Sequence, residues 1–182
     1  APKLQRVTTN HNSHKGGVHL DGPNKLASFS LPSLTEGDVY IMHSQGPRKD
    51  GQLEATPMAK LELPKLKEGI IWISNQDKLS TLSLPSLQSS KRVYVNGCLI
   101  ASISMPSLST AGSISLRKLP SLSSVKLSAL TTLSSDRVSL TLNELDELSE
   151  LSMPKLQSAA GKLSVTDVPK LDSATVSALQ PK

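Results

Sequence analysis

The chain alternates apolar and polar residues over short stretches, and these stretches come in pairs along most of its length. The first stretch of each pair ends at a Leu-Pro-x-Leu motif, and the second follows a turn that contains Gly or Ser. Strict alternation is typical of half-buried β-strands, whereas an amphipathic helix needs a period of 3.6 residues. The pattern therefore predicts an all-β chain with little or no helix.

The Leu-Pro-x-Leu motif marks an internal repeat of 21 to 26 residues, apart from one longer interval of 32 residues. A unit of this length cannot bury its apolar face alone and must stack on its neighbours. The chain is therefore predicted to be a leucine-rich parallel β-solenoid of about seven coils. The copies, two of which have serine in place of proline, start at Leu31, Leu63, Leu84, Met105, Leu127, Met153 and Val176.

The alternating apolar residues are expected to point into the core, where Leu84, Ile103 and Val95 should be almost fully buried. In the first stretches, the expected inward residues are Phe29/Leu31, Leu61/Leu63, Leu82/Leu84, Ile103/Met105, Val125/Leu127 and Leu151/Met153. In the second stretches they are Val18/Leu20, Val39/Ile41, Ile71/Ile73, Val93/Val95, Ile114/Leu116, Val138/Leu140 and Leu163/Val165. Two motifs that fall off the repeat phase, at 119–122 and 168–171, are assigned to connecting turns.

The repeat also divides the chain. Residues 1–16 are mostly polar and are predicted to be a flexible N-terminal lead-in. Residues 17–182 are predicted to form a single β-solenoid domain. The interval of 32 residues implies an inserted loop near 43–57, because the Gly, Pro and charged residues there suit a protruding segment.

The segments Lys78–Leu87 (KLSTLSLPSL) and Gly112–Leu116 (GSISL) resemble a known type of repeat. They are similar to the receptor-L-domain-type leucine-rich repeats of fungal GPI-anchored cell-wall-organisation proteins and sporulation-specific surface proteins. The likeness covers about residues 17–180. It implies a secreted, noncatalytic protein of the cell wall or cell surface, with structural and adhesive roles. It also implies that any membrane attachment uses an anchor outside this chain.

Composition narrows the classes of function. The single cysteine, Cys98, excludes an internal disulfide framework and a zinc site made of several cysteines. Aromatic residues are only 2% of the chain, so the core must be aliphatic. The formal net charge is +5, yet the basic residues are dispersed and are not interleaved with aromatic ones, so nucleic-acid binding is not predicted.

The outward residues of the second stretches form the most informative pattern. They include three of the four aromatic residues of the chain, in one file. Aromatic rings can stack on sugar faces, and a coil spacing of about 4.8 Å is close to the length of one sugar in an extended β-linked polymer. The file therefore predicts a surface for cell-wall polysaccharide; alternatively, the rings stack only on one another. The outward residues, in chain order, are His19, Tyr40, Trp72, Tyr94, Ser115, Ser139 and Ser164, and the predicted ligand-binding residues among them are His19, Tyr40, Trp72 and Tyr94.

The outward residues of the first stretches suggest a second surface, a flat face rich in hydroxyl groups. Regular hydroxyl arrays can order water, as in ice-binding solenoids, but Lys and Glu interrupt this one, and a solvated sheet face is the simpler interpretation. The residues are Ser28/Ser30, Lys60/Glu62, Thr81/Ser83, Ser102/Ser104, Ser124/Lys126, Glu150/Ser152 and Ser173/Thr175.

Other functions have weaker support. A lectin-like module and a polysaccharide-cleaving enzyme remain alternatives, but the sequence has no Gly-x-Ser-x-Gly motif and no separated acid pair, so no catalytic residue is predicted. His11, His14 and His19 could gather a metal ion, yet a loose histidine-containing tail is the preferred interpretation, and no metal or cofactor is predicted. Neither end of the solenoid has an obvious polar cap, so the chain is expected either to be a fragment of a longer protein or to self-associate end to end.

Overall fold

The computed structural model of the protein describes residues 7–8, 17–21, 26–42 and 58–172. These residues form β-strands joined by turns and contain no helix. Accordingly, none of them belongs to a helix long and apolar enough to cross a membrane. The loop predicted near 43–57 and the motif copy at Val176 lie outside the described residues.

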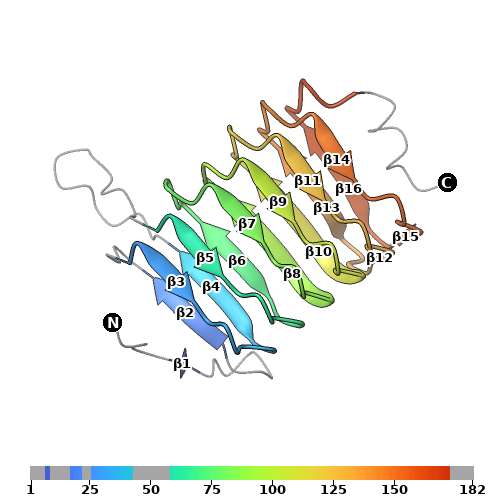
Figure 1. The fold of residues 1–182 in the computed structure, drawn as a ribbon. Helices are drawn as coiled ribbons and strands as arrows, with labels where there is room; N and C mark the ends of the chain where they lie inside the picture. The colour runs from blue at the N-terminus through green and yellow to red at the C-terminus, as the bar shows by residue number, and fades with distance from the viewer. Residues whose placement is uncertain (1–6, 9–16, 22–25, 43–57, 173–182) are drawn as a thin grey trace.

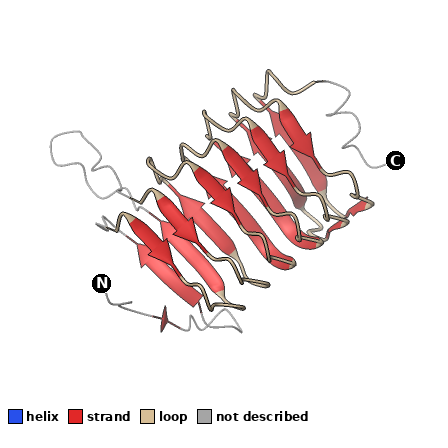
Figure 2. Cartoon of the chain, viewed as in Figure 1, coloured by secondary structure: helices blue, strands red, loops and turns tan. Residues whose placement is uncertain are grey.

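The strands form two facing layers that run the length of a stack of coils (Figure 1), and the turns lie along the sides (Figure 2). The first face contains β3 (Ser28–Ser30), β5 (Lys60–Glu62), β7 (Thr81–Ser83), β9 (Ser102–Ser104), β11 (Ser124–Lys126) and β14 (Glu150–Ser152). The second face contains β2 (Gly17–Asp21), β4 (Asp38–Met42), β6 (Ile71–Ser74), β8 (Ser89–Asn96), β10 (Thr110–Arg117), β13 (Val138–Asn143) and β16 (Lys162–Thr166). A short side consists of β12 (Thr132–Leu133), β15 (Ser158–Ala159) and the first residues of β8 and β10.

Neighbouring strands within each face are parallel, and successive coils stack in sequence order. Val39 pairs with Ile71, and Ile71 pairs with Val93, so equivalent positions of the repeat lie side by side. Six coils contribute a strand to both faces, and β2 adds half a coil. The predicted all-β parallel solenoid is therefore confirmed, with about six turns among the described residues.

The two faces differ in the continuity of their hydrogen bonding. The second face is one sheet from β2 to β16. The first face is divided into a sheet of β3 and β5 and a sheet of β7, β9, β11 and β14. The coil that contains β5 and the coil that contains β7 are therefore joined by strand pairing in the second face only. Every other pair of successive complete coils that the structure describes is joined by strand pairing in both faces.

The core is aliphatic and follows the alternation of the sequence. Leu84 and Ile103 are 1% exposed and Val95 is 0% exposed, as predicted. In the last coil, Leu151, Met153 and Leu163 are only half-buried. Among the described residues, that coil has a neighbour on one side only, so the described core covers its inward side chains from that side alone.

The Leu-Pro-x-Leu motif forms a tight turn after each strand of the first face. The N–H of Leu108 donates to the carbonyl of Met105 at 3.2 Å, which closes a four-residue turn with proline at its second position. Proline is favoured there because its fixed φ suits the turn. The off-phase motif at 119–122 forms the same turn on the opposite side of the coil, where the N–H of Leu122 donates to Leu119 at 3.0 Å. This confirms its assignment to a connecting turn.

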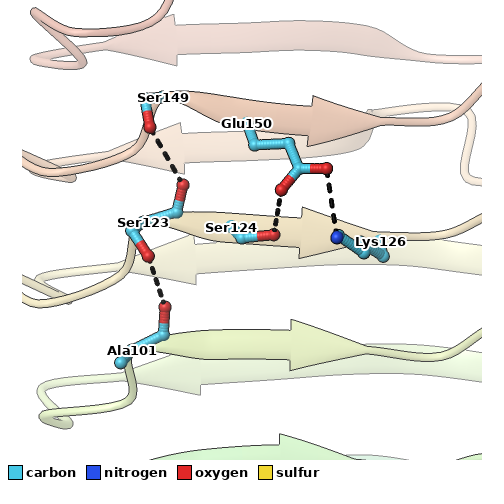
Figure 3. A network of polar contacts seen from close by, with 6 residues as sticks. All are labelled: Ala101, Ser123, Ser124, Lys126, Ser149 and Glu150. Carbon is cyan, nitrogen blue, oxygen red and sulfur yellow. Dashed lines mark hydrogen bonds and ion pairs between the residues drawn. The ribbon is translucent and has the colours of Figure 1, made fainter.

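Hydroxyl groups at the turns join several coils to the preceding one. Ser86 Oγ donates to the carbonyl of Pro64 at 2.7 Å, and Ser107 Oγ donates to that of Pro85 at 2.6 Å. Figure 3 shows a second row, in which Ser149 donates to the Ser123 carbonyl and Ser123 donates to the Ala101 carbonyl. The abundance of serine thus has a structural cause, because many hydroxyls bind a backbone carbonyl one coil away.

Where the structure describes it, the side of a coil opposite the Leu-Pro-x-Leu turn begins with a residue in the left-handed backbone region. The residue that follows it points into the core, so this position repeats through the stack as Gln76, Cys98, Leu119 and Leu145. The left-handed residues are Asn75, Gly97, Lys118, Glu144 and Asp167, with φ between 51° and 63°.

One coil departs from the predicted register. In β13 the pairing with β16 shifts between Val138 and Leu140. As a result Val138, predicted to point inward, is 39% exposed, and Ser139, predicted to point outward, is buried. The inward pair is instead Leu140 and Leu142. The cause is the longer repeat of this coil, whose extra residues are taken up before Leu140.

The N-terminal edge of the second face is not an open strand along its whole length. β1 (Val7–Thr8) pairs antiparallel with β2, with Val7 opposite Val18 and Thr8 opposite Gly17. The sequence indicated no cap at this end, because two residues are too few to show an alternating pattern. An end-to-end contact at this edge would have to displace or extend β1.

The turn hydroxyls generate the first prediction. Replacing Ser107 by Ala should lower the free energy of unfolding by about 1 kcal/mol, because it removes one intramolecular hydrogen bond. Ser121 is the matched control, since it has the same place in a Leu-Pro-Ser-Leu turn but makes no side-chain hydrogen bond among the described residues. Chemical denaturation of both alanine variants would measure the difference. Equal losses of unfolding free energy in the two variants would contradict a stabilising role for the turn hydroxyls.

Candidate functional site

The predicted aromatic file exists as one row across the second face. His19 pairs with Tyr40, Tyr40 with Trp72, and Trp72 with Tyr94. They come from β2, β4, β6 and β8, and each is the outward residue between two inward apolar ones. His19 is exposed and the other three are half-buried. The structure thus brings together all four residues that the sequence singled out; we call them the aromatic file.

The rings of the aromatic file contact one another. Trp72 and Tyr94 are stacked, with ring centroids 4.2 Å apart and planes 27° apart. Tyr40 and Trp72 are tilted, at 6.5 Å and 31°, and His19 and Tyr40 are at 5.7 Å and 34°. Because Trp72 and Tyr94 cover part of each other's faces, a ligand meets mainly ring edges there. The wider spacing on either side of Tyr40 leaves more of its ring faces uncovered.

A basic side chain borders the aromatic file. The guanidinium carbon of Arg92 lies 5.9 Å from the centre of the Trp72 ring, within the range of a cation–π contact. Arg92 is exposed and stands two residues before Tyr94 on the same strand, so it points to the same side of the sheet. The aromatic surface therefore continues into a positively charged one.

Tyr40 keeps its proton at neutral pH. Burial raises the pKa of its phenol first, the negative charge of Asp38 raises it further, and Arg92 lowers it. Asp38 is itself buried, and its Oδ1 accepts a hydrogen bond from the N–H of Ile70 at 2.9 Å. The Tyr40 hydroxyl is thus a neutral group that can donate to, or accept from, a polar ligand.

In the coils that follow Tyr94, the residues of the same row carry hydroxyl groups instead of aromatic rings. Ser115 pairs with Tyr94, Thr141 with Ser115, and Ser164 with Thr141. Thr141 takes the place predicted for Ser139, whose hydroxyl instead donates to the Ser135 carbonyl and accepts the N–H of Gly161, both at 2.9 Å. The row therefore has an aromatic N-terminal part and a hydroxyl-bearing C-terminal part.

The hydroxyl-rich first face is interrupted by charged contacts. Lys60 Nζ lies 2.7 Å from Glu62 Oε1. In Figure 3, Glu150 accepts a hydrogen bond from Ser124 at 2.8 Å and pairs with Lys126 at 3.2 Å. These contacts lower the pKa of Glu150, the Ser124 hydrogen bond most of all. The ion pairs break the regular hydroxyl spacing that an ice-binding face needs.

A hollow of about 380 Å³ lies where the short side bends into the second face. No periodic pattern in the sequence predicted this hollow. At this bend β10 approaches β8 so closely that only glycine fits at 112, where a Cβ atom would lie 2.2 Å from the carbonyl oxygen of Lys91. The sequence feature that could have indicated the hollow is Gly112, which stands one coil after the consecutive basic residues Lys91 and Arg92. The hollow, which we call the bend hollow, is lined in part by Glu68, Ser89, Lys91, Arg92, Thr110 and Ser113.

Gln76 and Cys98 occupy an interior position that holds leucine in the next two coils, at Leu119 and Leu145. Gln76 is fully buried; its Nε2 donates to the Ser74 carbonyl at 3.0 Å, but its Oε1 has no partner. In the next coil, Cys98 Sγ donates to the Asn96 carbonyl at 3.3 Å. Burial raises the pKa of this thiol to about 11. Cys98 is therefore a protonated packing residue at neutral pH.

The structure describes only one of the three histidines considered as metal ligands. His19 is in the aromatic file, whereas His11 and His14 lie outside the described residues. Among the described residues, no three His, Cys, Asp or Glu side chains are grouped so as to hold a metal ion.

Comparisons of the chain with protein-family models, with curated proteins and with solved structures find no match. The resemblance to fungal surface proteins therefore stays a prediction that rests on the Leu, Ser and Pro pattern.

Gln76 gives a stability prediction. Replacing it by Leu should raise the free energy of unfolding by about 1 kcal/mol, because an unpaired buried acceptor costs about 1–3 kcal/mol and the lost hydrogen bond contributes about 1 kcal/mol. Exposed Gln88 is the control, and its leucine variant should stay within about 0.5 kcal/mol of the wild type. Denaturant titrations would compare them. A less stable Gln76→Leu variant would show that the amide is satisfied in solution.

Cys98 gives a prediction on reactivity. At pH 8 the folded protein should resist a disulfide-exchange reagent, because burial excludes the reagent and keeps the thiol protonated. Labelling should be fast in denaturant and should accelerate as the pH approaches 11. A Leu99→Cys, Cys98→Ala variant supplies an exposed thiol at the neighbouring position and should react rapidly when folded. Comparable rates for both positions at pH 8 would refute this assignment.

Proposed function

We propose that the protein is a noncatalytic structural or adhesive component of an extracellular surface or cell wall, and that it contacts polysaccharide through the aromatic file. The observation that carries the proposal is the alignment of His19, Tyr40, Trp72 and Tyr94 in one row, one per coil. The extracellular location rests on the resemblance of the repeats to those of wall proteins.

A row with one ring per coil suits a polymer better than a small molecule. The rings recur with the strand spacing of about 4.8 Å, which is close to the length of one sugar in an extended β-linked chain. Each sugar–ring contact contributes little, about 1 kcal/mol beyond the area it buries. Appreciable affinity therefore requires several consecutive contacts, which a long chain provides.

The ring geometry refines how such a chain would bind. Trp72 and Tyr94 present ring edges, so a sugar would contact their rims and the Tyr94 hydroxyl. Tyr40 has more open faces on both sides, and its neutral hydroxyl is available for hydrogen bonding. Sugars pack their C–H groups against the faces of aromatic rings, so the open faces of Tyr40 form the main apolar contact, and the tyrosine hydroxyls add polar contacts at the ring tips.

The test is retention on insoluble polymers. Wild-type protein should be retained on at least one of chitin, β-glucan and cellulose, and Trp72→Ala should lose most of this retention because it removes the central ring. Ser115→Ala is the matched control, since Ser115 occupies the same row in the coil after Tyr94. Its retention should equal that of the wild type.

Thermal unfolding of each variant would show that it is folded before retention is compared. Trp72→Phe keeps a ring and should recover much of the lost binding. Equal retention of wild type and Trp72→Ala on every polymer, with both folded, would exclude the aromatic file as the contact surface.

A further inference from the structure

The bend hollow lies beside the aromatic file and has a different chemistry. Lys91 and Arg92 are consecutive, both are exposed, and both line the hollow. Arg92 also contacts the Trp72 ring, so one side chain joins the hollow to the file. The two surfaces are therefore parts of one continuous area on β6, β8 and β10.

The walls of the bend hollow carry groups that bind sugars and anions. The hydroxyls of Ser89, Thr110 and Ser113 line it and make no intramolecular hydrogen bond among the described residues. Each hydroxyl can both donate and accept. Glu68 adds one negative charge, but it already interacts within the chain. The two basic side chains leave the hollow with an excess of positive charge.

The floor of the hollow is held by the fold. Ser90 is buried, and its Oγ lies 2.7 Å from the Gly69 carbonyl oxygen and 2.9 Å from that of Arg92. These contacts connect the bend of β8 to the preceding coil. The backbone that carries Lys91 and Arg92 is thus fixed before a ligand arrives, which reduces the entropy lost on binding.

We infer that the bend hollow is a binding site for an acidic sugar unit of a polysaccharide, whose carboxylate or sulfate group pairs with Lys91 and Arg92 while the chain continues along the aromatic file. This inference rests on the proposed function and adds the class of polymer. The hydroxyl-lined wall would bind the sugar hydroxyls, and the cations would select an anionic unit over a neutral one.

The experiment compares three soluble β-linked cellulose derivatives coupled to beads: carboxymethyl cellulose, cellulose sulfate and uncharged hydroxyethyl cellulose. The wild type should bind at least one acidic derivative at least tenfold more tightly than hydroxyethyl cellulose, and binding should weaken as salt rises. Lys91→Gln/Arg92→Gln should lose about tenfold in affinity, because both charge-assisted contacts are removed. The acidic polymer that is retained distinguishes carboxylate from sulfate recognition.

A matched double variant controls for overall charge. Arg117→Gln/Lys155→Gln removes one Arg and one Lys that are exposed and do not line the hollow. It should bind as the wild type does, and equal weakening of both double variants would overturn the inference.

Tryptophan fluorescence locates the ligand, because Trp72 is the single tryptophan and Arg92 contacts its ring. The retained acidic polymer should change the emission of the wild type in a saturable way, and binding without such a change would place it elsewhere.

Failure of the wild type to retain either acidic polymer would also overturn the inference. The proposed function would still stand if retention on neutral insoluble polymers depended on Trp72, so the two failures are distinguishable.

Discussion

Parallel, in-register stacking is the constraint on which the rest of the structure depends. Each coil has to place its backbone donors and acceptors one strand spacing from those of its neighbours. Any group that prevents this approach is excluded, and any group that bridges it is favoured. Glycine at 112, where a Cβ would meet a backbone carbonyl, and serine at 107, which donates to one, are two responses to the same demand.

The regular part of this arrangement could be predicted from the sequence because stacking repeats the same positions. Alternation around Leu84 and Val95 identified the inward residues of both faces, and the spacing of the motif then aligned Tyr40, Trp72 and Tyr94. Apart from assigning the extra residues of the 32-residue interval to a loop near 43–57, only a constant register was required. A file of outward side chains is therefore as predictable as the core behind it.

The departures could not be predicted, since they arise where coils differ in length or bend. The extra residues before Leu140 moved Ser139 inward, and a repeat count does not show on which side of a position they are absorbed. The bend hollow depends on how β8 and β10 turn at Lys91 and Gly112, a three-dimensional property without a periodic signature. Likewise, Gln76 occupies an interior position that only the aligned coils reveal.

The divided first face has a mechanical meaning. Between β5 and β7 the strand ladder runs through the second face alone, while every other junction between complete described coils has a ladder on both faces. Tension applied along the axis of the stack is therefore shared by fewer backbone hydrogen bonds at this junction than at its neighbours. Under such tension, this is the plane at which the described stack would part first, leaving the coils on either side intact.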